Sequence, residues 1–187
     1  MIFTSIMITN HFFPSYMSSI KSLEQLINHF EDEPDSRRAE ILKDTNIPLG
    51  EFTKFTSWKD GDYTRNCIVR TKSFEFILLC WDLNACSPIH GHDDKDCWVY
   101  QIDGELTEKI LMESDQGFEL KDTNTIQKGM VSYMHDKMGY HALENKSYSR
   151  AMSLHIYAEP IDKCKVYCED TRKFKTLEMS YDCDYSS

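Results

Sequence analysis

A series of short β-rich runs is the feature that most constrains the fold of this 187-residue chain. From Thr64 onward, runs of β-branched and aromatic residues alternate with polar segments such as Asp103-Gly104 and Lys128-Gly129. Such runs favour strands, and glycine beside a polar residue favours the turns between them. We expect strands at residues 66–70, 73–81, 97–102, 106–112, 117–121, 130–135 and 151–157. Many short strands at near-regular spacing predict a mainly β fold, either a barrel or a two-sheet jelly roll.

A small helical element precedes the predicted strands. Apolar residues recur at helical spacing between Ser22 and Phe30, and Ser22 is a suitable N-cap. Pro34 ends this helix, after which residues 36–43 and 48–55 can form further helical turns. We expect a single domain over residues 20–187, with helices within 20–58 and a barrel over about 64–180.

The first 19 residues start with an apolar stretch that polar residues interrupt within ten positions, and the first basic residue is Lys21. This pattern fits neither a signal peptide nor a membrane-spanning helix. We expect residues 1–19 to be a poorly ordered extension.

The charge and the cysteines exclude several classes of protein. The formal net charge of -10 has the wrong sign for binding nucleic acid or an anionic membrane surface. The seven cysteines are odd in number and contain no CxxC pair, so a disulfide framework is not expected. Reduced thiols are typical of a cytoplasmic protein, which is the location we predict.

Two histidines one residue apart, His90 and His92, indicate a metal site. Side chains on a strand alternate between faces, so both rings can reach one ion, and His141 can supply a third ligand. Three imidazoles leave coordination positions open for a substrate. Paired strand histidines can also be surface residues or structural zinc ligands, and clusters of histidine bind zinc and nickel as well as iron.

Two further segments carry candidate site residues. Ser153, His155 and Tyr157 alternate along one predicted strand, so they face the same side and can form a hydrogen-bonded chain. Arg65 offers a guanidinium that can bind a carboxylate bidentately, although an isolated arginine is more often a surface ion-pair partner. The remaining histidines (His11, His29 and His135) lie in no motif, and we expect them at the surface.

Four separated motifs together resemble the cysteine dioxygenases, the thiol dioxygenase branch of the cupin superfamily. Within them, Cys97 and Gly104 follow the histidine pair at the spacing of the first cupin motif, with cysteine in place of its glutamate. The resemblance spans about residues 22–179 and implies a cupin jelly-roll barrel. The motifs are Tyr63-Thr-Arg65-Asn66, His90-x-His92-(x)4-Cys97, His141-(x)3-Asn145 and Ser153-Leu-His155-Ile-Tyr157.

The resemblance also implies a reaction and a metal centre. Such an enzyme uses Fe(II) and O2 to oxidise the thiol of free L-cysteine to cysteine sulfinic acid, in cysteine catabolism toward taurine and sulfate. His90, His92 and His141 would hold the iron, while Arg65 and Tyr63 would bind the substrate carboxylate. The family also leads us to expect a monomer.

The resemblance assigns roles to the remaining motif residues. Tyr157 would lie beside the metal, joined to Cys97 by a thioether bond and oriented by His155 and Ser153. His155 would not be a metal ligand. Cys164 would lie near the mouth of the site and affect substrate access, with an ordinary partly exposed thiol as the alternative.

Two departures from the family pattern concern the loops beside these motifs. Many members follow the tyrosine with Ser-Pro-Pro and a cis bond, whereas Tyr157 is followed by Ala158-Glu159-Pro160. A cis bond before a residue other than proline costs about 3 kcal/mol, so we expect a trans bond. Pro88 should stiffen the chain leading to His90.

Two other functions remain open from the sequence. One is the same chemistry on another small thiol such as 3-mercaptopropionate, although enzymes acting on that thiol generally carry glutamine at the position of Arg65. The other is a non-catalytic metal-binding cupin, because one fold can carry many functions.

Overall fold

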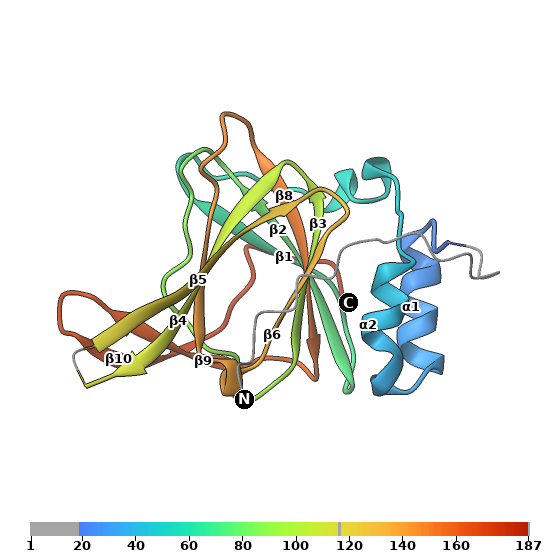
Figure 1. Cartoon of the computed structure of the whole chain (residues 1–187). Coiled ribbons are helices and arrows are strands. Elements are labelled where there is room, and N and C mark those ends of the chain that lie inside the picture. Colours follow the sequence, from blue (N-terminus) through green and yellow to red (C-terminus); the bar gives the residue numbers. More distant parts are fainter. Residues whose placement is uncertain (1–18, 116, 187) are drawn as a thin grey trace.

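The computed structural model describes residues 19–115 and 117–186 of the chain (Figure 1). The predicted extension, residues 1–19, lies outside this range except for its last residue. The predicted limits of the domain stay a prediction. Among the described residues, the structure contains no helix that is long and apolar enough to cross a membrane.

The larger of two facing sheets has six strands in the order β11-β1-β2-β8-β3-β6. Its strand β8 pairs antiparallel with β2 on one side and with β3 on the other, which places it in the middle of the sheet. The strands are β1 (Tyr63–Arg70), β2 (Phe74–Trp81), β3 (Cys97–Asp103), β6 (Val131–Met134), β8 (Ala151–Ala158) and β11 (Cys183–Asp184).

The second sheet is built from two parts that the segment around His90 joins. Three strands run in the order β5-β4-β7, and β10 pairs with β9. His90 forms isolated β-bridges to His141 on β7 and to Val166 on β9, so it fills the space between the two parts. The strands are β4 (Glu105–Ser114), β5 (Gly117–Gln127), β7 (Tyr140–Glu144), β9 (Lys163–Cys168) and β10 (Lys173–Glu178).

Both faces of the central strands are buried, and each face packs against a different partner. On β2, Phe76 and Leu78 belong to a core shared with the helices, whereas Ile77 and Leu79 belong to the core between the sheets. The inner core also contains Leu106 and other residues of the second sheet. The predicted mainly β, jelly-roll fold is therefore confirmed, and double burial explains why β2 reads as one continuous apolar run.

Two helices cover the outer face of the larger sheet (Figure 1). They are α1 (Leu23–Asp32) and α2 (Arg38–Lys43), joined by the short helix η1 (Asp35–Arg37), and η2 (Leu49–Glu51) and η3 (Thr53–Phe55) follow. Ser22 is the N-cap of α1, as predicted, because its hydroxyl accepts a hydrogen bond from the Gln25 amide. Leu26 and Phe30 of α1 are buried against the sheet.

The seven predicted strands are present, but four others were not expected. β5 extends to Gln127, six residues beyond its predicted end. The unexpected strands are β7, β9, β10 and β11. Lysines recur in both β9 and β10, and most β10 side chains are exposed, so neither strand has the apolar run on which strand prediction depends.

Candidate active site

Three histidines meet inside the jelly roll and could hold a metal ion. The candidate ligand atoms of His90, His92 and His141 lie within 4.8 Å of one another. His92 and His141 are fully buried. The ring centroids are 5.2 Å apart for His90 and His92, 4.6 Å apart for His90 and His141, and 4.7 Å apart for His92 and His141.

Hydrogen bonds fix which nitrogen of two of these rings faces the others. The Nδ1 of His90 donates to the Pro88 carbonyl at 3.0 Å, and the Nδ1 of His141 donates to Glu108 Oε1 at 2.8 Å. In the neutral form of each ring this leaves Nε2 unprotonated, and the two Nε2 atoms lie 3.3 Å apart. Two facing lone pairs at this distance repel each other unless a cation lies between them, so the pair fits a metal ion.

His92 supplies a second observation in favour of a metal. Both of its ring nitrogens are buried without a hydrogen-bond partner among the described residues. An unpartnered buried polar group is costly, and coordination of an ion would satisfy it. Burial lowers the pKa of His92 well below its usual value, and burial with His141 nearby lowers the pKa of His90 to about 3. Neutral imidazole is the form that binds a metal.

The prediction that a regular strand carries His90 and His92 is wrong, although their rings do converge. His90 forms only isolated bridges, and His92 lies in the loop after it, where Asp93 and Asp94 have positive φ values of 55° and 61°. Asp136 holds this loop by accepting hydrogen bonds from the amides of His92 at 2.5 Å and of Asp94 at 2.9 Å.

A close approach explains the glycine between the two histidines. A Cβ atom on Gly91 would lie 2.9 Å from Asp136 Oδ1, closer than side-chain carbons come. A side chain at this position would displace the Asp136 carboxylate, which is hydrogen-bonded to the loop.

Glu108 and Asp136 are site residues that the sequence analysis missed. Glu108 is fully buried and accepts from the Ser132 hydroxyl at 2.6 Å as well as from His141. One signal was available, because Glu108 lies between Leu106 and Ile110 on the inward face of a strand where only apolar residues are expected. No comparable pattern marks Asp136.

Glu108→Gln should weaken metal binding about 10- to 100-fold, the usual effect of losing a carboxylate behind a ligating histidine. The amide keeps the shape but replaces the anionic acceptor that fixes the His141 tautomer. Titration of the metal-free protein with Fe(II) or Co(II) measures this effect. Glu144→Gln is a control on β7, because Glu144 is a partly exposed ion-pair partner of Lys109. An affinity equal to that of the wild type in both variants would contradict this role of Glu108.

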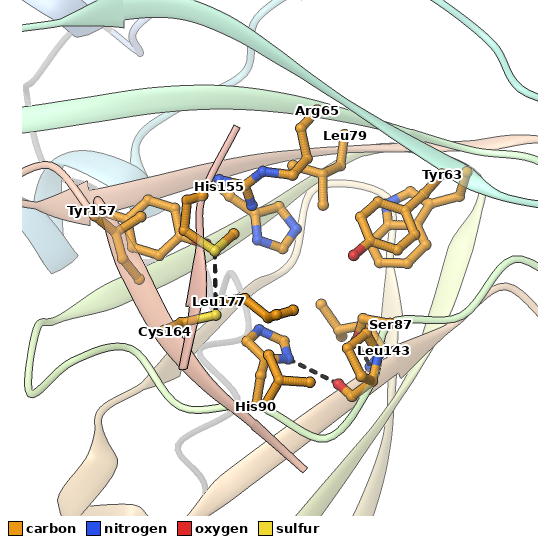
Figure 2. A pocket seen from close by; sticks show the side chains of 15 residues that line it. Tyr63, Arg65, Leu79, Ser87, His90, Leu143, His155, Tyr157, Cys164 and Leu177 are labelled. Carbon is orange, nitrogen blue, oxygen red and sulfur yellow. Dashed lines mark hydrogen bonds between the residues drawn. The ribbon is translucent and has the colours of Figure 1, made fainter. Parts of the chain in front are cut away.

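A cavity of about 70 Å³ lies beside the histidines (Figure 2). His90 lines one side of it, and Arg65 and His155 lie on the opposite side. Arg65 donates from Nε to the Ser180 carbonyl at 3.2 Å, whereas its Nη2 is buried without a hydrogen-bond partner in the described part of the chain. A guanidinium nitrogen without a hydrogen-bond partner beside a cavity is suited to binding an anionic group.

Tyr63 and Cys164 line the same cavity. The Tyr63 ring stacks on Trp81 with centroids 4.8 Å apart, and burial raises the pKa of its hydroxyl. Cys164 is buried, with its sulfur 3.2 Å from that of Met179. The alternative of a partly exposed thiol is therefore wrong for Cys164. Its role in substrate access stays a prediction.

Cys97 and Tyr157 are direct cross-strand partners on β3 and β8. Side chains opposite each other in an antiparallel pair are neighbours on the same face. Burial raises the pKa of the Cys97 thiol, an effect that the Tyr157 hydroxyl partly offsets. Burial and Cys97 likewise raise the pKa of Tyr157 well above its usual value, so the phenol stays protonated.

The predicted chain of Ser153, His155 and Tyr157 is only partly present. His155 Nε2 and Ser153 Oγ are 3.0 Å apart, and Trp81 donates to the same hydroxyl at 2.9 Å. Among the described residues no hydrogen bond joins His155 to Tyr157, contrary to expectation. The hydrogen bond to Ser153 occupies Nε2, and burial lowers the pKa of His155 well below its usual value, which keeps the ring neutral.

The loop after Tyr157 follows the expectation for its sequence. The described residues contain no cis peptide bond, and Glu159 has a positive φ of 72°. Its amide donates to the Ser73 carbonyl at 2.9 Å, and the Lys95 ammonium donates to the Pro160 carbonyl at 2.6 Å.

The profile of the cysteine dioxygenase type I family matches residues 15–170. The chain belongs to this family. The matched residues include the histidine cluster, Arg65 and the Cys97–Tyr157 pair on β3 and β8. Members of the family are enzymes of the cupin superfamily, and the jelly roll described above is the cupin fold.

Several relatives named cysteine dioxygenase type 1 are similar to the chain. The identity is 28% over 137 residues for the protein of Danio rerio, with 70% of this chain and 68% of that one covered. It is 30% over 135 residues for Bos taurus, with 70% and 66% covered, and 26% over 136 residues for Homo sapiens, with 70% and 68% covered. The matched part is about two thirds of each relative.

Solved structures match this cysteine dioxygenase family member more weakly. TT1209 from Thermus thermophilus matches with a TM-score of 0.48 and 16% identity, covering 58% of this chain and 93% of its own. A Bacillus subtilis oxalate decarboxylase variant matches with a TM-score of 0.47 and 16% identity, covering 69% and 31%.

Proposed function

We propose that the chain is a non-heme Fe(II) dioxygenase that oxidises the thiol of free L-cysteine to cysteine sulfinic acid. Both atoms of O2 enter the product, so the thiol sulfur is oxidised, O2 is reduced, and no other reductant is needed. The observation that carries the proposal is one cavity that presents His90 on one side and the free Nη2 of Arg65 on the other. Membership of the family supports the same reaction.

Iron held by His90, His92 and His141 would supply open coordination positions and the redox chemistry needed to activate O2. The ligand atoms of the three histidines are all within reach of one ion. Because all three ligands are neutral, the ion would keep its full positive charge and favour a thiolate as its partner.

The other side chains of the cavity would bind and orient the substrate. Arg65 would bind the carboxylate through Nη2, with the Tyr63 hydroxyl as a further donor. Tyr157 would donate a hydrogen bond, because its raised pKa keeps the phenol protonated. His155 would stay neutral and be held by Ser153, acting on the site through its neighbours and not as a metal ligand.

We also propose the thioether bond between Cys97 and Tyr157. Its formation would replace the S–H of the thiol and one ring C–H of the tyrosine with an S–C bond, with O2 as the oxidant. Protein incubated with Fe(II), O2 and L-cysteine should then lose the mass of two hydrogen atoms, and the linked peptides should be found by mass spectrometry. Cys97→Ala should keep its mass unchanged, and Cys164→Ala is the matched control. An unlinked Tyr157 peptide after many turnovers would contradict the cross-link.

The proposal is tested by direct assay of the purified protein. It is loaded with Fe(II) without oxygen, mixed with L-cysteine and O2, and followed by oxygen electrode and mass spectrometry. Formation of cysteine sulfinic acid with one O2 consumed per cysteine is the expected result. Faster turnover of 3-mercaptopropionate would identify another thiol as the substrate. Tight iron binding without oxygen uptake in the presence of either thiol would favour a non-catalytic metal-binding cupin.

A further inference from the structure

A short C-terminal segment, which we call the strap, forms part of the cavity wall. The strap is residues 179–182, between β10 and β11, and it lies beyond residue 170, where the family match ends. Met179 lines the cavity, and its amide donates to the Asp162 carbonyl at 2.7 Å. The strap therefore adds to the cavity a wall residue, Met179, that lies outside the family motifs.

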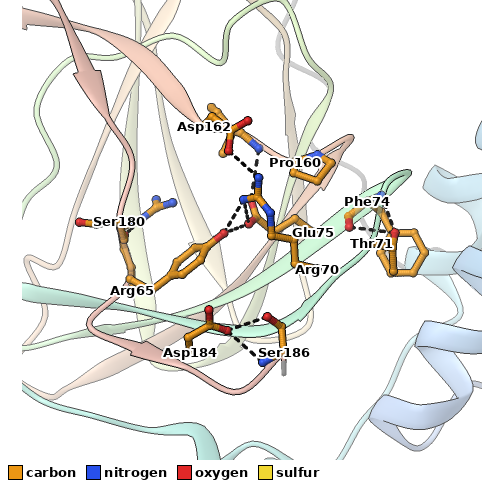
Figure 3. Close-up of polar contacts among 12 residues, drawn as sticks. Arg65, Arg70, Thr71, Phe74, Glu75, Pro160, Asp162, Ser180, Asp184 and Ser186 are labelled. Atoms are coloured by element: carbon orange, nitrogen blue, oxygen red, sulfur yellow. Dashed lines mark hydrogen bonds and ion pairs between the residues drawn. The ribbon is translucent and has the colours of Figure 1, made fainter.

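The strap holds the arginine that the proposed function assigns to the substrate carboxylate. The backbone amide of Arg65 donates to Asp182 Oδ2 at 2.8 Å, and the Asp182 amide donates back to the Arg65 carbonyl at 2.8 Å. The Arg65 Nε donates to the Ser180 carbonyl at 3.2 Å (Figure 3). These bonds fix the backbone and the inner part of the side chain, and they leave Nη2 buried without a hydrogen-bond partner among the described residues.

A partly buried polar cluster anchors the strap through Tyr181. The Tyr181 hydroxyl donates to Glu75 Oε1 and accepts from Arg70 Nη1 at 2.6 Å. Arg70 also donates to Glu75 at 2.7 Å and to Asp162 at 2.5 Å (Figure 3). Glu75 is fully buried, and burial raises the pKa of its carboxyl.

The polar cluster lies next to Tyr157, one of the residues that line the cavity. Glu75 is the cross-strand partner of Tyr157 on β8, and its Oε2 accepts from the Ile161 amide at 3.3 Å. Burying the Glu75 carboxyl beside the partly exposed Arg70 costs free energy, and an apolar side chain would fill this place at a lower cost. The arrangement instead fixes one geometry among β1, β2, the strap and the loop after β8.

We propose that Tyr181 is a positioning residue that sets the direction of the Arg65 guanidinium and so the affinity for the carboxylate of the substrate. The inference rests on the proposed function, since it assigns Arg65 to that carboxylate. Loss of the Tyr181 hydroxyl frees the strap, and Ser180 and Asp182 then hold Arg65 less firmly.

Tyr181→Phe tests the inference with the smallest possible change. We expect KM for L-cysteine to rise about five- to tenfold, less than for the loss of a hydrogen bond made directly to the substrate, because Tyr181 acts through the strap, while kcat stays within about twofold. Iron affinity should not change, because the variant leaves the three histidines untouched. Tyr185→Phe is the matched control, because Tyr185 follows the strap just after β11 but is 41% exposed and packs against Phe55.

Two competing ligands separate positioning from general damage to the cavity. 3-Mercaptopropionate carries a carboxylate without an amine, and its inhibition constant should rise by the same factor as KM. Cysteamine carries an amine without a carboxylate, so its inhibition constant should stay unchanged. Equal weakening of both ligands, or an unchanged KM, would overturn the inference.

Asp182 provides a second pair of variants. Asp182→Ala removes the acceptor for the Arg65 amide and should raise KM in the same way, whereas Asp182→Asn keeps an oxygen at this position and should restore most of the affinity. If the wild type does not oxidise L-cysteine, the proposed function fails. The inference is then decided by calorimetry of 3-mercaptopropionate binding to the iron-loaded wild type and Tyr181→Phe, where equal affinities overturn it.

Discussion

His92→Ala should lose tight binding of Fe(II) and, with it, oxygen uptake in the presence of L-cysteine. Two remaining histidines cannot complete the site, and we expect activity to fall by at least about 1000-fold, or roughly 4 kcal/mol in transition-state stabilisation. The fold should survive, because neither ring nitrogen of His92 bonds to another described residue. Metal analysis after dialysis and oxygen-electrode rates measure the two effects.

The matched control for this variant is His29→Ala. His29 lies in the last turn of α1, on the element that covers the outer face of the larger sheet. It should bind iron and consume oxygen as the wild type does. Iron bound by His92→Ala at wild-type affinity would show that the metal site is wrongly assigned.

Arg65→Gln should reduce kcat/KM for L-cysteine by about 100- to 1000-fold, since removing one partner of a buried charge pair costs about 3 to 4 kcal/mol. The loss should appear mainly in KM, because the guanidinium would bind the carboxylate and not the reacting sulfur. Arg65→Lys should recover little, since an ammonium cannot form the bidentate contact. Steady-state rates over a range of L-cysteine concentrations measure these effects.

Arg37→Gln is the control for charge alone, because Arg37 pairs with Glu33 and Glu40 on the helical element. It should leave kcat/KM unchanged. Equal rates for Arg65→Gln and the wild type would mean that the substrate carries no carboxylate at this place, and they would favour another thiol.

Runs of apolar residues made most of the fold predictable. The larger sheet was anticipated because β2, β3 and β8 bury both faces and so consist of long apolar runs. The second sheet was anticipated less well, because in β9 the buried residues Cys164 and Val166 alternate with lysines. A local pattern detects a strand only where enough of the strand is apolar.

The candidate site was predictable where short motifs carry it. Histidine spacing and the alternation of Ser153, His155 and Tyr157 were visible in the sequence, and the structure brings these side chains to one region. Glu75 and Tyr181 could not be linked from the sequence, because 106 residues separate the two partners. Contacts over such a distance depend on how the sheets fold together and not on any local pattern.

Because β8 is buried on both faces, the side of the site that β8 forms is more rigid than the side formed by the His92 loop and the strap. Ser153, His155 and Tyr157 lie on a strand held by neighbours on both edges and by packed cores on both faces, so their backbone can shift only if much of the domain opens. The loop that carries His92 and the strap beside Arg65 lie outside the strands and are held mainly by the hydrogen bonds of Asp136 and of Tyr181. Any adjustment to ligands of different shape would therefore come from the loop and the strap, while the β8 side serves as a fixed template.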